Sequence, residues 1–288
     1  MDGIINVYKP SGISSNFVLT KLKKSLGIKK LGHLGTLDPL ACGVLPVMVN
    51  KGTKLFDYYL NKNKVYRAVF TFGVETDTLD SEGKVVNRCE KIPTKDEILL
   101  GIKKLTGKLD QIPPNFSAKN INGKRAYEKA RNGEIFELKS KIVEVYDFKL
   151  ISQINKDSFL FEIACSSGTY IRSLARDLGQ ILNTRAFMSG LIRTKSGNFD
   201  ILKSTYYKDL TIESVNDKII TPNELLEDLP KLVVDDSFYK QITNGVKIKV
   251  LHKDEEKVAV VCKNRLIGIG SVENNLVSIK TNLLGDVW

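Results

Sequence analysis

The sequence predicts an α+β domain followed by a small all-β module. Strand-like segments alternate with helix-like segments over residues 1–229, whereas residues 230–288 hold short strand-like runs spaced as in a small β-barrel. A chain of 288 residues also exceeds the usual length of a single domain. We therefore expect a mixed domain over residues 1–229 and a separate β module over residues 230–288.

Periodicity predicts the elements of the first domain. The segment after Ser14 and Ser15 is expected to be a helix, because its apolar residues recur at helical spacing. Residues 64–73 alternate as in a strand, and residues 76–86 are expected to form a turn that leads into another strand. Residues 94–107 have Thr94 as N-cap and Glu97 at the capping-box position, which predicts an amphipathic helix ending at Gly107.

The same patterns predict the elements of the second half of the chain. Residues 158–182 predict a strand, a Ser-Gly turn and a helix with Thr169 as its N-cap. A further helix near residues 221–227 is expected to end before Pro230. The strand-like runs of the last module are residues 246–251, 257–263, 266–272 and 276–280.

Residues 110–141 differ in character from the segments around them. They open with Pro113 and Pro114, and residues 119–141 contain seven Lys/Arg against three Glu. We expect a polar excursion from the core that is partly helical around residues 126–131. Its basic side chains form either a nucleic-acid contact or an ordinary solvated face.

The chain is strongly basic, with a net charge of +11 and a pI near 9.3. Because residues 230–288 carry nine Lys/Arg against seven Asp/Glu, the first domain supplies +9 of this excess. Residues 21–30 alone have five lysines and no acid. This distribution favours a polyanionic partner, and a basic surface kept for solubility is the alternative.

Cysteine and histidine usage argues against disulfides and zinc. The four cysteines lie far apart with no C-x-x-C pair, and His33 and His252 are the only histidines. Magnesium sites built from Asp and Glu are left open by this count. No apolar run approaches the roughly 18 residues of a membrane span, and the N-terminus lacks the features of a signal peptide. We expect a cytoplasmic protein without a membrane contact.

One carboxylate stands out in the segment Gly32–Leu45. Asp38 lies between Leu37 and Pro39 in an apolar, glycine-rich stretch, where an Asp before Pro often caps a turn. Two other glycine- and serine-marked segments, residues 7–15 and 165–179, each place a cation at the turn next to an apolar element. These cations are Lys9 and Arg172.

With these phrases the chain resembles the bacterial tRNA pseudouridine-55 synthases of the TruB type. Six phrases carry the resemblance in the order of the family, over about residues 5–200: "NVYKPSGISS", "GHLGTLDPLACGVLPV", "KVYRAVFTFGVETDTLDSEG", "QIPPNFSAKNINGKRAYEKAR", "CSSGTYIRSLARDLG" and "LIRTKSGNF". Tyr8, Asn16 and Cys42 depart from it at positions where Asp, His and Thr are common. Residues 230–288 are less specifically similar to the PUA-type RNA-binding module of the family.

The resemblance implies a mixed, mostly antiparallel sheet of the pseudouridine synthase type with flanking helices, and a C-terminal PUA module. It implies isomerisation of uridine to pseudouridine at position 55 in the T arm of tRNA, by an enzyme that uses no cofactor and no metal. Asp38 matches the catalytic aspartate, acting either as covalent nucleophile or as support for charge at C1′. Arg172 matches the arginine that pairs with it, which would keep Asp38 ionised.

The same resemblance assigns substrate-binding roles to four further residues. Tyr66 matches the tyrosine that stacks on the target base, and it shares a strand face with Ala68, Phe70 and Phe72. Leu191 resembles the apolar residue near the uracil, and His33 the residue that fills the stack left by the flipped uridine. Lys9 is expected to support the loop of the site. Without the family motif, Tyr66 and His33 are ordinary core residues.

The excursion at residues 110–141 resembles the RNA-gripping insertion of the family, with phosphate contacts from Lys119, Lys124, Arg125, Lys129 and Arg131. A tRNA-binding folding chaperone with the same basic surface is the alternative function. A guide-RNA-dependent relative that modifies ribosomal RNA is a third, although no segment here resembles those through which that relative meets partner proteins. We expect a monomer that needs no protein partner.

Overall fold

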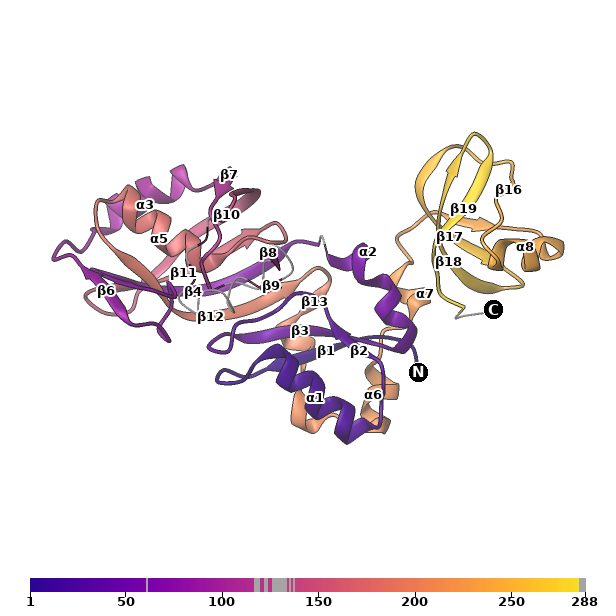
Figure 1. The fold of residues 1–288 in the computed structure, drawn as a ribbon, viewed down its shortest axis with the longest axis horizontal. Helices are drawn as coiled ribbons and strands as arrows, with labels where there is room; N and C mark the ends of the chain where they lie inside the picture. The colour runs from indigo at the N-terminus through magenta and orange to yellow at the C-terminus, as the bar shows by residue number, and fades with distance from the viewer. Residues whose placement is uncertain are drawn as a thin grey trace.

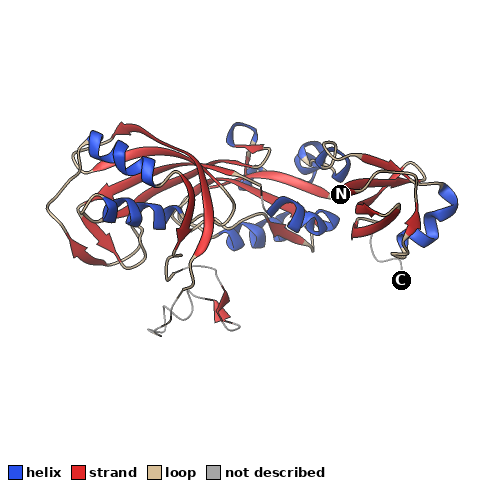
Figure 2. Cartoon of the chain, turned by 90° about the horizontal axis from the view of Figure 1, so that it is seen from above, coloured by secondary structure: helices blue, strands red, loops and turns tan. Residues whose placement is uncertain are grey.

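A computed structural model describes residues 1–60, 62–116, 120–121, 124–125, 134, 136 and 138–284. It has two parts, a large domain built on a long twisted sheet and a small β module that holds the C-terminal part of the chain (Figure 1). Helices α3 and α5 cover one half of the long sheet, and α1 and α6 lie beside the other half (Figures 1 and 2). The α+β prediction is confirmed.

The long sheet is mixed and mostly antiparallel. Its order is β14-β1-β3-β12-β4-β11-β10-β7, with β2 beside β3 and β13 beside β12, and the parallel pairs are β1/β14 and β3/β12. The strands are β1 (Gly3–Lys9), β2 (Leu31–His33), β3 (Cys42–Val49), β4 (Lys64–Phe72), β7 (Gly107–Gln111), β10 (Lys141–Gln153), β11 (Ser158–Cys165), β12 (Ala186–Ser196), β13 (Phe199–Asp200) and β14 (Thr205–Tyr206).

Two short hairpins lie outside this sheet. The predicted turn at residues 76–86 joins β5 (Val74–Thr76) to β6 (Val85–Arg88). Within the basic excursion, the described backbone forms β8 (Asn120–Ile121) and β9 (Lys124–Arg125), which pair antiparallel. The helix expected around residues 126–131 falls outside the described residues.

Helices α1 and α3 begin where their capping residues predict. Ser14 caps the first helix and Gly27 ends it in a left-handed conformation, while Thr94 and Glu97 form the expected capping box. That helix ends at Lys104 rather than at Gly107, which begins β7. The α-helices are α1 (Ser15–Leu26), α2 (Phe56–Leu60), α3 (Lys95–Lys104), α5 (Ile171–Ile181), α6 (Ile212–Lys218), α7 (Pro222–Leu225) and α8 (Tyr239–Thr243), and the 3₁₀ segments are η1 (Asn50–Leu55), η2 (Ile201–Lys203), η3 (Tyr207–Asp209) and η4 (Asp236–Phe238).

The expected cap of α5 is wrong. Its N-cap is Tyr170, not Thr169, whose hydroxyl donates to the carbonyl of Ser166 instead. The amide of Gln111 at the end of β7 serves this helix start, since its Oε1 accepts from the Tyr170 N–H at 2.8 Å and its Nε2 donates to the Tyr170 carbonyl at 3.2 Å. These bonds hold the residue that precedes the helix, and among the described residues no side chain caps the N–H groups of its first turn.

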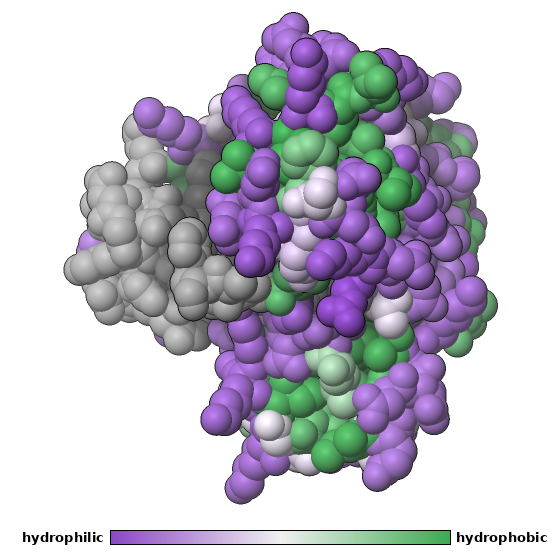
Figure 3. Space-filling model, turned by 90° about the vertical axis from the view of Figure 1, so that its right-hand side faces the viewer, coloured by the Kyte–Doolittle hydropathy of each residue, from purple (hydrophilic) through white to green (hydrophobic). Residues whose placement is uncertain are grey.

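The C-terminal module is a curled five-stranded sheet of order β15-β17-β18-β19-β16, which fits a PUA-like half-barrel. Its expected strand at residues 246–251 is reduced to two residues. Polar residues separate the apolar patches on the end of the molecule that faces the viewer in Figure 3. The strands are β15 (Lys231–Val233), β16 (Ile248–Lys249), β17 (Glu255–Cys262), β18 (Arg265–Glu273) and β19 (Leu276–Asn282).

One apolar cluster joins the module to the large domain. Ala259 and Ile269 of the module pack in the same cluster as Leu225 and Leu226, which follow the start of α7. Val44, Met48, Leu55 and Tyr59 of the large domain also belong to it. The Tyr59 hydroxyl donates to the Leu225 carbonyl at 2.6 Å. The boundary near Leu229 therefore lies beside a shared core, and the division at that residue stays a prediction.

Candidate active site

The loop that carries Asp38 runs from β2 to β3 and is fastened to the segment after β1. Lys9 is fully buried, and its Nζ donates to the carbonyls of Ile13, Pro10 and Pro39 at 2.6, 2.9 and 3.3 Å. The Ser15 hydroxyl donates to the Leu37 carbonyl at 3.0 Å and accepts from the Leu37 N–H at 2.9 Å. Burial lowers the pKa of Lys9 to about 8. The contacts of Lys9 agree with its expected role as a support of the Asp38 loop.

Arg172 and Asp38 form an ion pair, although they come from different halves of the domain. Arg172 lies in the first turn of α5, and its Nη2 donates to Asp38 Oδ1 at 3.2 Å while its Nε lies 3.0 Å from Oδ2. The carboxylate therefore contacts the guanidinium rather than the backbone of its own turn. The Asp38 side chain is 31% exposed, against 7% for Arg172, so Asp38 is the member of the pair that a substrate can reach.

A second buried carboxylate, Asp80, contacts the other side of the same guanidinium, and sequence reasoning missed it. Its Oδ2 lies 3.3 Å from Arg172 Nη1, and its side chain is only 5% exposed. The Thr78 hydroxyl and the Glu82 N–H donate to Asp80 Oδ1 at 2.6 and 3.1 Å. The motif that supplies Asp80 was recognised, but its burial has no signature in a sequence that reads as a turn.

Two backbone carbonyls also accept hydrogen bonds from Arg172. Its Nη1 donates to the Thr78 carbonyl at 3.1 Å, and its Nη2 donates to the Phe116 carbonyl at 3.0 Å. Phe116 lies within the basic excursion, at the end of the described stretch that opens it. One planar side chain thus connects the Asp38 loop, the turn after β5 and the start of the excursion.

Burial raises the pKa of the Asp38 carboxyl above its usual value, and the guanidinium of Arg172 opposes this rise. The nearby carboxylate of Asp80 adds to the upward direction, because two like charges disfavour each other. The pKa of Glu82 is raised for similar reasons, with burial first and Asp80 second. The site therefore concentrates negative charge around one buried cation.

Tyr66 shares a face of β4 with Ala68, as the strand alternation predicts, and Leu191 of β12 is paired with Ala68. Tyr66 itself is paired with Arg193 of β12. Tyr66 is 7% exposed and Leu191 8%. Burial raises the pKa of the Tyr66 phenol to about 12, and Asp38 lies near enough to add to this shift. That Tyr66 and Asp38 serve one site stays a prediction.

His33 lies at the end of β2, where its backbone is paired with Val47 of β3, and the residue is partly buried. Lys119, Lys129 and Arg131 fall outside the described residues. Only the backbone of Lys124 and Arg125 is described. The expected contacts of these residues with RNA stay predictions.

Comparison with known proteins decides the family. Residues 23–171 match the model described as TruB family pseudouridylate synthase, N-terminal domain, and they hold Asp38, Tyr66 and Asp80. The chain is 42% identical over 279 residues to tRNA pseudouridine synthase B of Clostridium novyi, covering 97% of this chain and 95% of that protein. The chain belongs to the TruB family.

Other TruB relatives and solved structures agree with this assignment. The chain is 38% identical to tRNA pseudouridine synthase B of Clostridium kluyveri, covering 98% of this chain and 96% of that protein. A chain of an H/ACA ribonucleoprotein, solved with a substrate RNA containing 2′-deoxyuridine, is 25% identical with a TM-score of 0.71 and covers 98% of this chain and 85% of that chain. A chain of an archaeal box H/ACA complex, at 23% identity and a TM-score of 0.71 over 99% of this chain and 89% of that chain, supports the fold.

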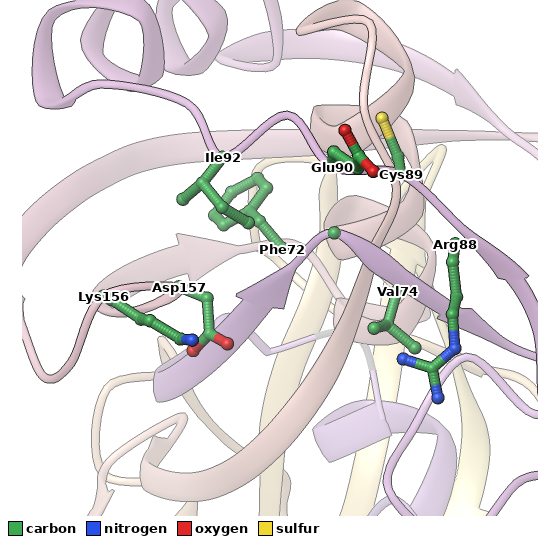
Figure 4. Close-up of a pocket in the computed structure, with 9 residues that line it drawn as sticks. Phe72, Val74, Arg88, Cys89, Glu90, Ile92, Lys156 and Asp157 are labelled. Carbon is green, nitrogen blue, oxygen red and sulfur yellow. The ribbon is translucent and has the colours of Figure 1, made fainter.

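One hollow of the described surface is lined by none of Asp38, Arg172 and Asp80. It measures about 620 Å³ and lies at the ends of β4, β5 and β6, where Arg88 and Lys156 stand on opposite sides without a converging set of acids or bases (Figure 4). Within the described residues, no three His, Cys, Asp or Glu side chains are grouped to hold a metal. In that same part of the chain, no helix is both long and apolar enough to cross a bilayer.

Proposed function

We propose that the protein isomerises uridine to pseudouridine at position 55 in the T arm of tRNA, with Asp38 as the catalytic residue. The observation that carries this proposal is the Asp38–Arg172–Asp80 arrangement. Arg172 is paired with both carboxylates, and the Asp38 side chain stays partly exposed to solvent. The relatives named tRNA pseudouridine synthase B, which match almost end to end, support tRNA as the substrate.

The reaction fits the groups that the site offers. It breaks the N1–C1′ bond of uridine, turns the base and forms a C5–C1′ bond, while a proton leaves C5 and one is gained at N1. The balance needs no oxidant and no second substrate. Asp38 acts in one of three ways: as a nucleophile at C1′ of the sugar or C6 of the base, by stabilising positive charge at C1′, or by directing the loss of a proton from the sugar. Arg172 fixes the orientation of its carboxylate.

The remaining site residues act on the flipped nucleotide. Tyr66 stacks on the uracil, Leu191 packs beside it, and His33 fills the space that the base leaves in the tRNA stack, which offsets part of the few kcal/mol that flipping costs. Lys9 supports the Asp38 loop through its three carbonyl contacts. The 230–288 module and the basic excursion hold the tRNA by its phosphates.

A stand-alone enzyme in the cytoplasm is part of the same proposal. The chain is 42% identical to a relative named for tRNA, and only 25% to the ribonucleoprotein chain, of which it covers 85%. Four free cysteines suit a reducing compartment. Light scattering after gel filtration tests the monomer.

The direct test is to incubate the purified protein with unmodified tRNA and to map pseudouridine by chemical labelling and primer extension. A single new pseudouridine at position 55 is expected. Pseudouridine elsewhere would overturn the site, and its complete absence would overturn the enzyme. If no pseudouridine forms at all, a tRNA-folding chaperone becomes the better proposal. The site itself argues against a chaperone, because such a function needs no exposed carboxylate paired with an arginine.

Replacing Asp80 by asparagine is expected to slow pseudouridine formation by about one to two orders of magnitude, because misplacing a group at the reacting centre costs about a hundredfold. The change also removes a negative charge that raises the pKa of Asp38. Since activity needs ionised Asp38 and falls as pH drops through that pKa, the acid limb of the rate profile moves to lower pH. Single-turnover rates across pH measure both effects, and an acid limb that moves upward would contradict this account.

Replacing Lys124, Arg125 and Lys129 together by alanine is expected to weaken tRNA binding and to flatten its salt dependence. Each lost phosphate contact reduces the slope of log K against log salt by about 0.7 to 0.9. A control variant removes equal charge elsewhere, with Lys103, Lys104 and Lys108 changed to alanine. If both variants keep the wild-type slope, the excursion is a solvated face.

Cutting the chain after Leu229 is expected to weaken tRNA binding and to spare the single-turnover rate at saturating protein, since every proposed catalytic group precedes the cut. The cut uncovers Leu225 and Leu226, and each apolar side chain loses about 1.5–3 kcal/mol when its burial is lost. The melting temperature therefore falls by several degrees. A truncated protein that folds and saturates with tRNA but makes no pseudouridine would contradict this division of roles.

A further inference from the structure

Arg193 is the largest side chain that is fully buried, with 1% of its surface exposed. It lies on β12 across from Tyr66 of β4 and from Gly43 of β3. Burying a guanidinium costs several kcal/mol unless its charge is paired. Among the residues that the structure describes, no carboxylate forms an ion pair with Arg193. A position that costs this much stability points to a task at the site beside it.

The hydrogen bonds of Arg193 join the start of the Asp38 loop to the first residues of β3, which follow the end of that loop. Its Nε donates to the Val44 carbonyl at 2.7 Å, and its Nη2 donates to the Gly35 carbonyl at 3.0 Å. These two carbonyls lie on either side of Asp38 along the chain. One guanidinium therefore holds the chain on both sides of the carboxylate.

The loop lies directly on this guanidinium. Gly35 has a φ of 89°, and a Cβ built there would lie 3.4 Å from Arg193 Nη1 and 3.4 Å from Lys64 Cε. Gly43 allows a still closer approach, because its Cβ would lie 2.2 Å from the backbone oxygen of Arg193. Glycine at both positions lets the loop rest on β12.

Arg193 also lies beside the phenol of Tyr66, whose pKa it lowers against the larger effect of burial. On its other side is Lys64, whose Nζ donates to the Lys62 carbonyl at 2.9 Å. Burial first and Arg193 second lower the pKa of Lys64 to about 8. A lysine at position 193 would face the same penalty, whereas a guanidinium keeps its charge and offers a planar set of donors.

We propose that Arg193 is a positioning residue for the reaction, whose guanidinium holds the Asp38 loop and the Tyr66 ring in one relative arrangement. It touches neither sugar nor base, and it acts through the two groups that do. This inference rests on the proposed function for its effect on rate, but its effect on the loop can be measured without any reaction.

The test compares Arg193→Met, which keeps the length of the side chain but no donor, with Arg193→Lys. Arg67→Met is the matched control, because Arg67 lies on the same strand next to Tyr66 but is exposed and pairs with Glu162 at 3.3 Å. Three quantities are measured: the single-turnover rate, the Kd for tRNA, and the hydrogen exchange of a peptide covering residues 34–41 against one from β17 and β18.

We expect Arg193→Met to lower the rate by about a hundredfold and Arg193→Lys by at least about tenfold, as loss of alignment at a reacting centre does. The Kd for tRNA stays within threefold, a range of about 0.6 kcal/mol. Exchange rises in the 34–41 peptide only, and Arg67→Met changes nothing. Wild-type rates in a folded Arg193 variant would overturn the proposal. So would exchange that rises in all peptides, or failure of both variants to fold, since Arg193 is then a residue of the core. If the wild-type protein makes no pseudouridine but the 34–41 peptide alone loosens, the proposed function fails and the positioning of the loop stands.

Discussion

Asp38→Asn is expected to abolish pseudouridine formation while leaving the Kd for tRNA within several-fold of wild type. The amide nearly preserves the shape of the carboxylate, but it is a poor nucleophile and carries no charge to support C1′. Loss of an essential catalytic group lowers rates by about ten-thousandfold or more. Single-turnover assays with the protein in excess measure the rate, and filter binding measures the affinity.

Asp57→Asn serves as the control for Asp38, because Asp57 lies exposed on α2. It should keep the wild-type rate. Substantial turnover by Asp38→Asn would remove Asp38 from the catalytic role and leave it as a residue of the turn. Loss of binding together with rate would show instead that the carboxylate holds the loop in shape.

Arg172→Lys is expected to give a folded protein that binds tRNA and turns over about a hundredfold more slowly, the loss that misplacement of a reacting group causes. The guanidinium reaches both oxygens of Asp38, Asp80 Oδ2 and two backbone carbonyls at once. An ammonium keeps the charge but has no planar fork, so it cannot serve all of these partners. Asp38 then stays close to a cation yet loses its fixed direction.

Arg185→Lys is the control, since Arg185 forms a half-exposed pair with Glu75 at 3.5 Å. A wild-type rate in Arg172→Lys would mean that charge alone suffices. Failure to fold would show that Arg172 is needed for the core, and the milder Asp80→Asn variant would then decide whether orientation matters for the rate.

The pairing of Asp38 with Arg172 was expected only through the resemblance to the TruB type, because the turns by themselves do not show which side chains meet. Asp80 could not be predicted, since "TDTLD" reads as an exposed turn. Its burial depends on Leu79, which adopts a φ of 61° and accepts from the Met188 N–H at 3.1 Å, a contact between distant parts of the chain. Arg193 was hidden for a different reason. An arginine in a strand is normally exposed, and only the pairing with β3 and β4 shows that this one faces inward.

The wrong cap of α5 has the same origin. Thr169 is a good local N-cap by composition, but its hydroxyl donates to the Ser166 carbonyl, and Gln111 of β7 holds the backbone of Tyr170, the actual N-cap. The capping and periodicity rules therefore placed α5 correctly but identified the wrong N-cap residue. Alternation did better for Tyr66, because the two-residue period of a strand fixes which side chains share a face before any partner strand is known.

The apolar cluster between the two parts of the molecule bears on how such proteins can evolve. Ala259 and Ile269 share a core with Leu225, Leu226 and residues of β3 and η1. A C-terminal module of this kind cannot be removed or exchanged without exposing apolar side chains of the large domain. A chain that acquired a foreign module by recombination would leave this surface uncovered unless the newcomer brought small and branched side chains at the same two positions. Changes on either side of the contact are therefore expected to be inherited together.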